Sequence, residues 1–262
     1  VKSNKMKKTA TSDFMEIEKQ RGISVATSVM GFEYEGYKIN ILDTPGHQDF
    51  AEDTFRTLTA VDSVIIVVDA AKGVETQTRK LMEVCRMRNT PVMVFVNKMD
   101  RQSGDSLDLL DELEKELHIG VRPLSWPIGN GETFKGVYNI FDGSLYLYEA
   151  SKQTVQEGIS INGLGDKLLE EKVGAQQAQT LRDELDFFAG VYDDFDVNAY
   201  LKAEVAPVFF GSALNNFGVK ELLDCFIRIA PQPGVSHTET RDVCPDEPSF
   251  SGFVFKIHAN MD

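Results

Sequence analysis

Asn97-Lys98-Met99-Asp100 follows directly on an apolar run, residues 91–96, and its residue types could read a guanine base. The Asp100 carboxylate can accept two hydrogen bonds at once, from the ring N–H and the exocyclic amine of guanine, a donor pair that adenine lacks. The stem of Lys98 can lie along the base, and the amide of Asn97 can tie neighbouring loops together. The alternative is a polar strand end that only turns the chain, so the motif needs support from elsewhere in the sequence.

A second polar motif, Asp43-Thr44-Pro45-Gly46-His47, ends another strand-like run at residues 37–42. Ligands of open α/β sheets bind outside the carboxyl ends of the strands, so two such motifs can face one site. We expect Asp43 to hold Mg²⁺ through water, Gly46 to leave its N–H open to a terminal phosphate, and His47 to orient an attacking water. A capped turn leading into a helix is one alternative. A His/Asp metal cluster of a hydrolase is another, but it leaves the guanine motif unexplained.

Two further segments suit the same nucleotide. Gly211-Ser212-Ala213-Leu214 is a loop of mostly small residues at a strand end, where the N–H of Ala213 can reach the guanine oxygen. Ser24 offers a hydroxyl to the Mg²⁺ shell and an N–H to the terminal phosphate, so loss of that phosphate would release its segment. Each segment alone is ordinary loop or turn composition. Their order along the chain, together with the first two motifs, favours a nucleotide site.

The elements that must position these residues follow from hydrophobic periodicity. Continuous apolar runs at 63–69 and 91–96 are typical of parallel strands buried on both faces, and helical patterns separate them. The predicted strands are 25–29, 37–42, 63–69, 91–96 and 207–210, and the predicted helices are 76–88, 106–117, 176–188 and 219–229. This alternation predicts an α/β fold with a mostly parallel, doubly wound sheet.

An insert and a second domain are also predicted. From Trp126 the pattern changes, and segments 137–141 and 144–148 flank Asp142-Gly143, which indicates a hairpin. We therefore predict an α+β insert at about 127–205, with no function assigned to it. Pro231-Gln232-Pro233-Gly234 reads as a linker, so residues 1–232 form the first domain and 233–262 the linker and first part of a second, β-barrel domain.

Composition limits the classes of partner. The 262 residues are 42% hydrophobic, enough for a substantial core, and the net charge is −14. Such acidity argues against autonomous binding to DNA or RNA, but it leaves room for a large ribonucleoprotein met through local patches. Cys85, Cys225 and Cys244 lack C-x-x-C spacing, which indicates reduced thiols in a cytoplasmic protein. No apolar stretch approaches the roughly 20 residues of a membrane span, and no signal sequence is present.

Taken together, the motifs resemble the translational GTPase family over nearly the whole chain. Among its branches, the sequence is most similar to that of bacterial peptide chain release factor 3. Elongation factors usually place Thr at the position of Ser24. The segments that carry the narrower match are 14–25, 56–62, 69–75, 134–139 and 209–219.

The resemblance implies a ribosome-dependent GTPase that uses GTP/GDP and Mg²⁺ and removes class I peptide chain release factors after peptide release. It implies in-line attack of water on the γ-phosphate, with His47 made productive by the large ribosomal subunit. Elongation factor G or a ribosome-protection protein is the alternative within the family. Family members of this branch carry β domains after the GTPase domain, and 250–262 looks like the start of the first.

One element of the family pattern is missing. No G-x-x-x-x-G-K-[ST] occurs in the 262 residues, whereas the family places this P-loop after its first strand, upstream of the region where Val1 begins. We therefore expect a P-loop-type GTPase fold without its first strand, P-loop and first helix. We also expect this polypeptide to be inactive by itself, and a non-catalytic module is a second class of function to test.

Overall fold

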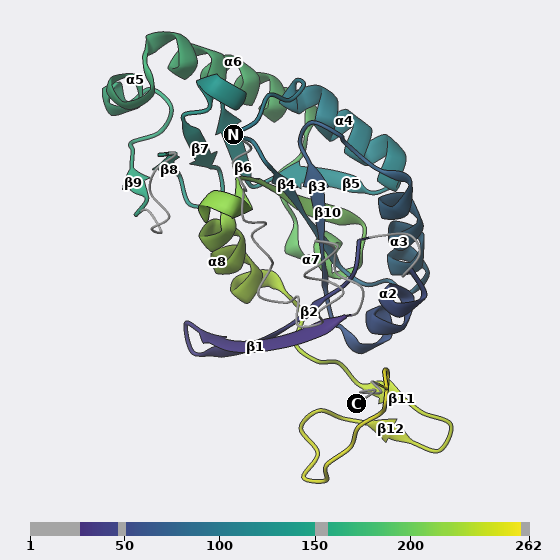
Figure 1. Cartoon of the computed structure of the whole chain (residues 1–262). Helices are drawn as coiled ribbons and strands as arrows, with labels where there is room; N and C mark the ends of the chain where they lie inside the picture. The colour runs from purple at the N-terminus through teal and green to yellow at the C-terminus, as the bar shows by residue number, and fades with distance from the viewer. Residues whose placement is uncertain (1–26, 47–50, 150–156, 258–262) are drawn as a thin grey trace, which may run out of the picture. The chain divides into compact units, whose positions relative to one another are not determined.

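The computed structural model describes residues 27–46, 51–149 and 157–257 (Figure 1). The chain divides into two units, which we describe separately: residues 63–231, and residues 1–62 with 232–262. Over the described residues, no helix combines the length and the apolar character that a membrane crossing requires.

A parallel sheet forms the centre of the larger unit. Its strands, in the order β3-β4-β10-β5, are β3 (Val64–Asp69), β4 (Val92–Asn97), β10 (Val205–Phe210) and β5 (Gly120–Pro123). All neighbouring pairs are parallel, and β4 and β10 are buried over almost their full length. Continuous apolar runs are what a sheet covered on both faces requires, so the predicted parallel α/β fold is confirmed.

Helices cover the two faces of this sheet. Figure 1 shows α3 (Thr76–Met87) and α4 (Ser106–Leu117) together on one side of the strands and α8 (Val219–Ile229) on the other. Asp105 caps α4 by accepting hydrogen bonds from two backbone N–H groups of its first turn. Helices α4 and α8 have the bounds that the sequence predicts.

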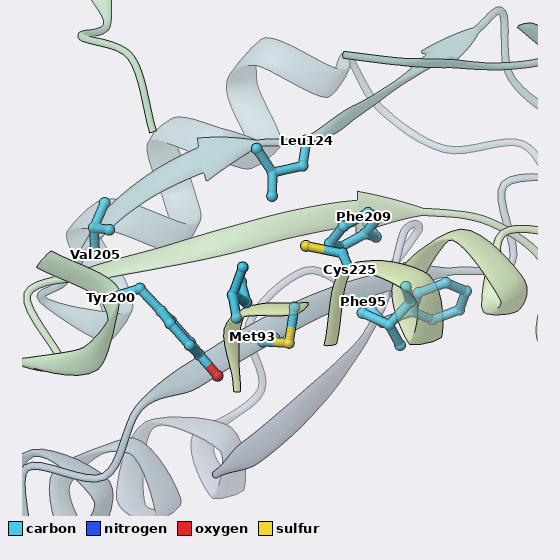
Figure 2. Close-up of a cluster of buried hydrophobic side chains, with 9 residues drawn as sticks. Met93, Phe95, Leu124, Tyr200, Val205, Phe209 and Cys225 are labelled. Carbon is cyan, nitrogen blue, oxygen red and sulfur yellow. The ribbon is translucent and has the colours of Figure 1, made fainter. Parts of the chain in front are cut away.

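The core beneath α8 is drawn in Figure 2, where Met93 and Phe95 of β4 lie near Phe209 of β10 and Cys225 of α8. Tyr200 of α7 (Val197–Leu201) belongs to the same cluster and its hydroxyl lies 2.8 Å from Ser63 Oγ. Alternation along β4 turns Met93 and Phe95 to this face and Val92, Val94 and Val96 to the opposite one.

The insert region contains an antiparallel sheet, and helices α5 (Lys167–Val173) and α6 (Ala175–Val191) follow its strands. The strands of this sheet, in the order β6-β7-β8-β9, are β6 (Ser125–Ile128), β7 (Gly136–Asn139), β8 (Ser144–Leu147) and β9 (Ile159–Ser160), with the short turn η3 (Gly131–Thr133). Trp126 anchors the insert to the main sheet: its Nε1 donates to Glu184 of α6 at 2.7 Å and its ring lies 5.6 Å from that of Phe210. The predicted hairpin is confirmed, although its strands end at Asn139 and begin at Ser144.

The smaller unit contains an antiparallel hairpin, β1 (Ser28–Tyr34) and β2 (Tyr37–Asp43). Glu35 and Gly36 both have positive φ, as a two-residue hairpin turn requires. The predicted strand at 25–29 thus runs on to Tyr34, while residues 25 and 26 lie outside the described residues.

The described part of this unit also contains helix α2 (Ala51–Thr57), the turn η2 (Leu58–Ala60) and the short pair β11 (Ser236–His237) and β12 (Asp242–Val243). The β element predicted from residue 250 is wrong for 250–257, which have no regular secondary structure. A strand needs a hydrogen-bonded neighbour, and none of the described strands pairs with this segment. The predicted domain boundary at 232 stays a prediction.

Candidate functional site

The loops that follow β4 and β10 are joined at the carboxyl edge of the parallel sheet. These strands are neighbours in register, with Phe210 opposite Val96. Beyond the ladder, Gly211 N–H donates to Val96 O at 2.9 Å, and Met99 N–H donates to Gly211 O at 3.1 Å. The base motif 97–100 and the loop 211–214 therefore lie side by side, as their positions at two strand ends predict.

Asn97 ties the two loops together through its side chain. Its Oδ1 accepts a hydrogen bond from Ala213 N–H at 2.9 Å and another from Lys98 N–H at 2.8 Å. This is the linking role that the sequence assigns to the Asn97 amide. The Ala213 N–H, predicted to reach the guanine oxygen, has a partner within the chain here, so a base would have to share or replace that bond.

Lys98 lies across the sheet edge toward β3. Its backbone has φ = 70°, and its Nζ lies 2.5 Å from Asp69 Oδ2. Burial raises the pKa of Asp69, but the hydrogen bond from Lys98, the one from Ala71 N–H and the charges of Lys98 and Lys72 together outweigh it, so the pKa of this carboxyl is lowered. The pair holds an ammonium group where the stem of Lys98 can lie along a base.

Sequence reasoning does not identify Asp69 as part of this site. In the sequence it is the last residue of the predicted strand 63–69 and the first of the family-like segment 69–75, and neither pattern assigns it a role in binding. The strand register identifies Asp69 as a site residue, because it is paired with Asn97 at the ends of β3 and β4.

Asp100 is half-buried, and within the described part of the chain no hydrogen bond reaches its carboxylate. Burial, and after it the negative charge of Asp100, raise the pKa of Tyr148. A carboxylate with unused acceptor positions fits the donor pair of guanine. Met99, between these residues, has a buried side chain that belongs to the core.

Ser212 shapes the loop after β10. Its N–H and C=O both bond to the backbone of Phe217, at 3.0 and 3.1 Å, and its Oγ accepts from Asn215 Nδ2 at 2.8 Å. A Cβ at Gly211 would lie 2.3 Å from Phe217 O, so only glycine fits there. Leu214 is 61% exposed at the same edge, where its side chain is available to a ligand.

The residues predicted to contact phosphate and Mg²⁺ belong to the smaller unit. Asp43 ends β2, and Thr44, Pro45 and Gly46 follow it. Pro45 O accepts a hydrogen bond from Thr54 of α2 at 3.3 Å, and none of the described residues places an atom within 4 Å of a Cβ built at Gly46. The described residues of the unit therefore leave the backbone at Gly46 open to approach.

Two predicted residues, Ser24 and His47, lie outside the described residues. The alternative of a His/Asp metal cluster includes His47 and is not tested. Among the residues that are described, no three His, Cys, Asp or Glu side chains gather closely enough to hold a metal ion.

Comparison with known proteins gives two findings. The family model of the elongation factor Tu GTP binding domain matches residues 1–232. A crystal structure of a protein from Thermus thermophilus superposes with a TM-score of 0.67 at 24% sequence identity, over 87% of this chain and 35% of that one. At this identity the likeness shows the fold alone, and the chain spans about a third of the length of that protein.

Proposed function

The chain belongs to the family of the elongation factor Tu GTP-binding domain, and from this premise we propose that it forms part of a translation factor that hydrolyses GTP on the ribosome. Its mixed α/β structure with a parallel sheet is the P-loop-type GTPase fold. Family membership implies guanine-nucleotide binding. The identity of the factor, its Mg²⁺ ligands and its ribosomal partners are part of the proposal.

The observation that carries the proposal is the edge formed by Asn97, Asp100 and Ala213. The Asn97 side chain holds the two loops together, and the half-buried Asp100 carboxylate beside them has acceptor positions unused by the described residues. This arrangement suits a planar base with an adjacent N–H and amine. It supports guanine as the base and gives no support to adenine.

In the proposed reaction, bound GTP supplies the γ-phosphate and Mg²⁺ neutralises charge on it. Asp43 and the hydroxyl of Ser24 would hold the ion, which would supply charge neutralisation, and the backbone N–H of Gly46 would bind the phosphate. His47 orients the attacking water. Catalysis is then mostly positioning and charge neutralisation, as is general for phosphoryl transfer.

We further propose that the factor acts in termination and releases class I peptide chain release factors from the ribosome. Support comes from the similarity of segments 14–25 and 209–219 to the release factor 3 branch. The test adds the complete protein and GTP to ribosomal termination complexes that carry a class I factor. We expect faster dissociation of that factor. Translocation without factor release would instead assign an elongation factor G-like role.

His47→Ala provides the mechanistic control in this assay. Nucleotide affinity should stay close to that of the wild type, because the imidazole orients water and does not hold the base. Ribosome-stimulated hydrolysis should fall by about two orders of magnitude, the usual range for a positioned acid–base or water-orienting group. An unchanged turnover rate would remove His47 from the mechanism.

A non-catalytic module remains the second class of function. The 262 residues contain no P-loop pattern, and P-loop contacts to phosphate supply much of the affinity of this fold for nucleotides. Titration of a fluorescent GDP analogue into this polypeptide should therefore show weak or no binding. Micromolar or tighter binding would overturn that expectation.

A further inference from the structure

The first turn of the insert contacts the loop that carries Asp100. Gly131 N–H donates to Met99 O at 3.0 Å, and Asn130 Nδ2 donates to Gly104 O at 3.3 Å. The fit is close, because a Cβ at Gly131 would lie 3.0 Å from Gln102 Cα. The segment 130–133 therefore supports the base motif from the insert side.

The same insert contacts the other loop through three aromatic rings, Phe134, Tyr148 and Phe217, which we name the aromatic cluster. Ring centroids lie 5.1 Å apart for Phe134 and Tyr148, 5.7 Å for Phe134 and Phe217, and 5.5 Å for Tyr148 and Phe217. Phe134 and Phe217 are buried, and Tyr148 is half-buried. Such tilted and edge-on pairs are favourable beyond the area they bury.

Phe217 connects the aromatic cluster to the loop 211–214 of the proposed guanine site. Two backbone hydrogen bonds join it to Ser212, and Ser212 adjoins Ala213, whose N–H is held by Asn97. A ring displaced at Phe217 would therefore shift the backbone that faces the base.

We propose that the aromatic cluster and the 130–133 turn make the insert a positioning element of the guanine site. Tyr148 is its central positioning residue, because it touches both other rings. The inference rests on the proposed guanine binding and gives the insert a role within it. Burial, and after it the negative charge of Asp100, raise the pKa of Tyr148, so this ring interacts electrostatically with the carboxylate that would read the base.

The insert provides a matched control at Phe188. This half-buried ring of α6 also contacts two aromatic neighbours, with ring centroids 6.2 Å from Trp126 and 4.7 Å from Tyr192. Neither neighbour lies in the segments 97–104 and 211–218 that form the proposed guanine site. Phe188→Ala and Tyr148→Ala thus remove a comparable number of ring contacts from one insert. Only the second touches the proposed site.

The first measurement needs no nucleotide. Hydrogen exchange of the complete protein is followed in peptides covering 97–104 and 211–218, for the wild type, Tyr148→Ala, Tyr148→Phe and Phe188→Ala. We expect exchange in both peptides to accelerate about tenfold in Tyr148→Ala, and to stay at the wild-type rate in the other two variants. Equal exchange in all four, or equal acceleration in Phe188→Ala, would overturn the proposal.

The second measurement is the dissociation rate of a fluorescent GDP analogue. Tyr148→Ala should release it about tenfold faster, while Tyr148→Phe, which keeps the ring, should restore the wild-type rate. If the wild type binds the analogue and Tyr148→Ala releases it at the same rate, the positioning role is wrong. If the wild type binds no guanine nucleotide, the proposed function fails, and the exchange measurement still decides whether the insert orders the loops.

Discussion

Gly211→Ala perturbs the tightly packed loop that follows β10 at the proposed guanine site. A Cβ at this position would lie 2.3 Å from Phe217 O, 2.8 Å from Phe95 Cζ and 3.1 Å from Gly218 Cα. Two of these atoms belong to the backbone and the third to a buried ring, so no flexible side chain can yield. The loop itself must move.

The cost of that movement can be worked from the contacts. Overpacking a filled site costs about 1–3 kcal/mol. A shifted Gly211 also weakens its two backbone hydrogen bonds, to Val96 O and from Met99 N–H; each contributes about 1 kcal/mol, and loss of about half of each adds about 1 kcal/mol. We expect the free energy of unfolding to fall by about 2–4 kcal/mol in total.

Urea unfolding followed by tryptophan fluorescence measures this loss, because Trp126 is the single tryptophan of the sequence and is fully buried in the same unit. With a slope of about 2 kcal/mol per molar urea, the midpoint should fall by roughly 1–2 M. Gly190→Ala is the control: apart from the backbone of α6 itself, no described residue has an atom within 4 Å of its Cβ, so alanine should stabilise by about 0.5–1 kcal/mol. A Gly211→Ala midpoint at or above that of the wild type would refute the reasoning.

Two further predictions concern pH. Asp69→Asn removes the partner of Lys98 and should cost about 1 kcal/mol or less at pH 7. Because the pKa of folded Asp69 is lowered from 3.8, this difference should disappear in urea titrations as the pH falls below that value. Tyr200 behaves in the opposite sense: burial raises its pKa to about 12, so the unfolded state ionises first and stability falls as the pH rises from about 10 to about 12. Tyr200→Phe should reduce that alkaline decline by about 2–3 kcal/mol, measured as urea midpoints across the same range.

The elements that sequence predicts best are those whose local signals agree with their surroundings. Helix α4 has a capping Asp105 at its start and leucines that are buried at helical spacing, so its bounds follow from residues 105–117 alone. Strand β5 was not predicted, because Arg122 and Pro123 are poor strand residues. It forms through its pairing with β10, a neighbour that is about 85 residues away along the chain.

The same distinction applies to the residues of the candidate site: some carry a local sequence signal, and others are brought together only by the fold. Asn97, Lys98, Asp100 and the 211–214 loop could be found because each follows an apolar run, and strand ends mark the ligand edge of such sheets. Asp69 could not be found without knowing that β3 lies beside β4. Tyr148 and Phe217 come together only through the fold, since no local pattern relates them.

The central claim is that Asp100 recognises the guanine base. Asp100→Asn in the complete protein tests it most directly. The measurement is the ratio of affinities for GDP and for xanthosine diphosphate, by titration of fluorescent analogues. The amide loses one acceptor for the guanine donor pair and gains a donor for the ring carbonyl of xanthine, so GDP should weaken at least about tenfold while the xanthine nucleotide tightens. An unchanged GDP affinity would contradict the account.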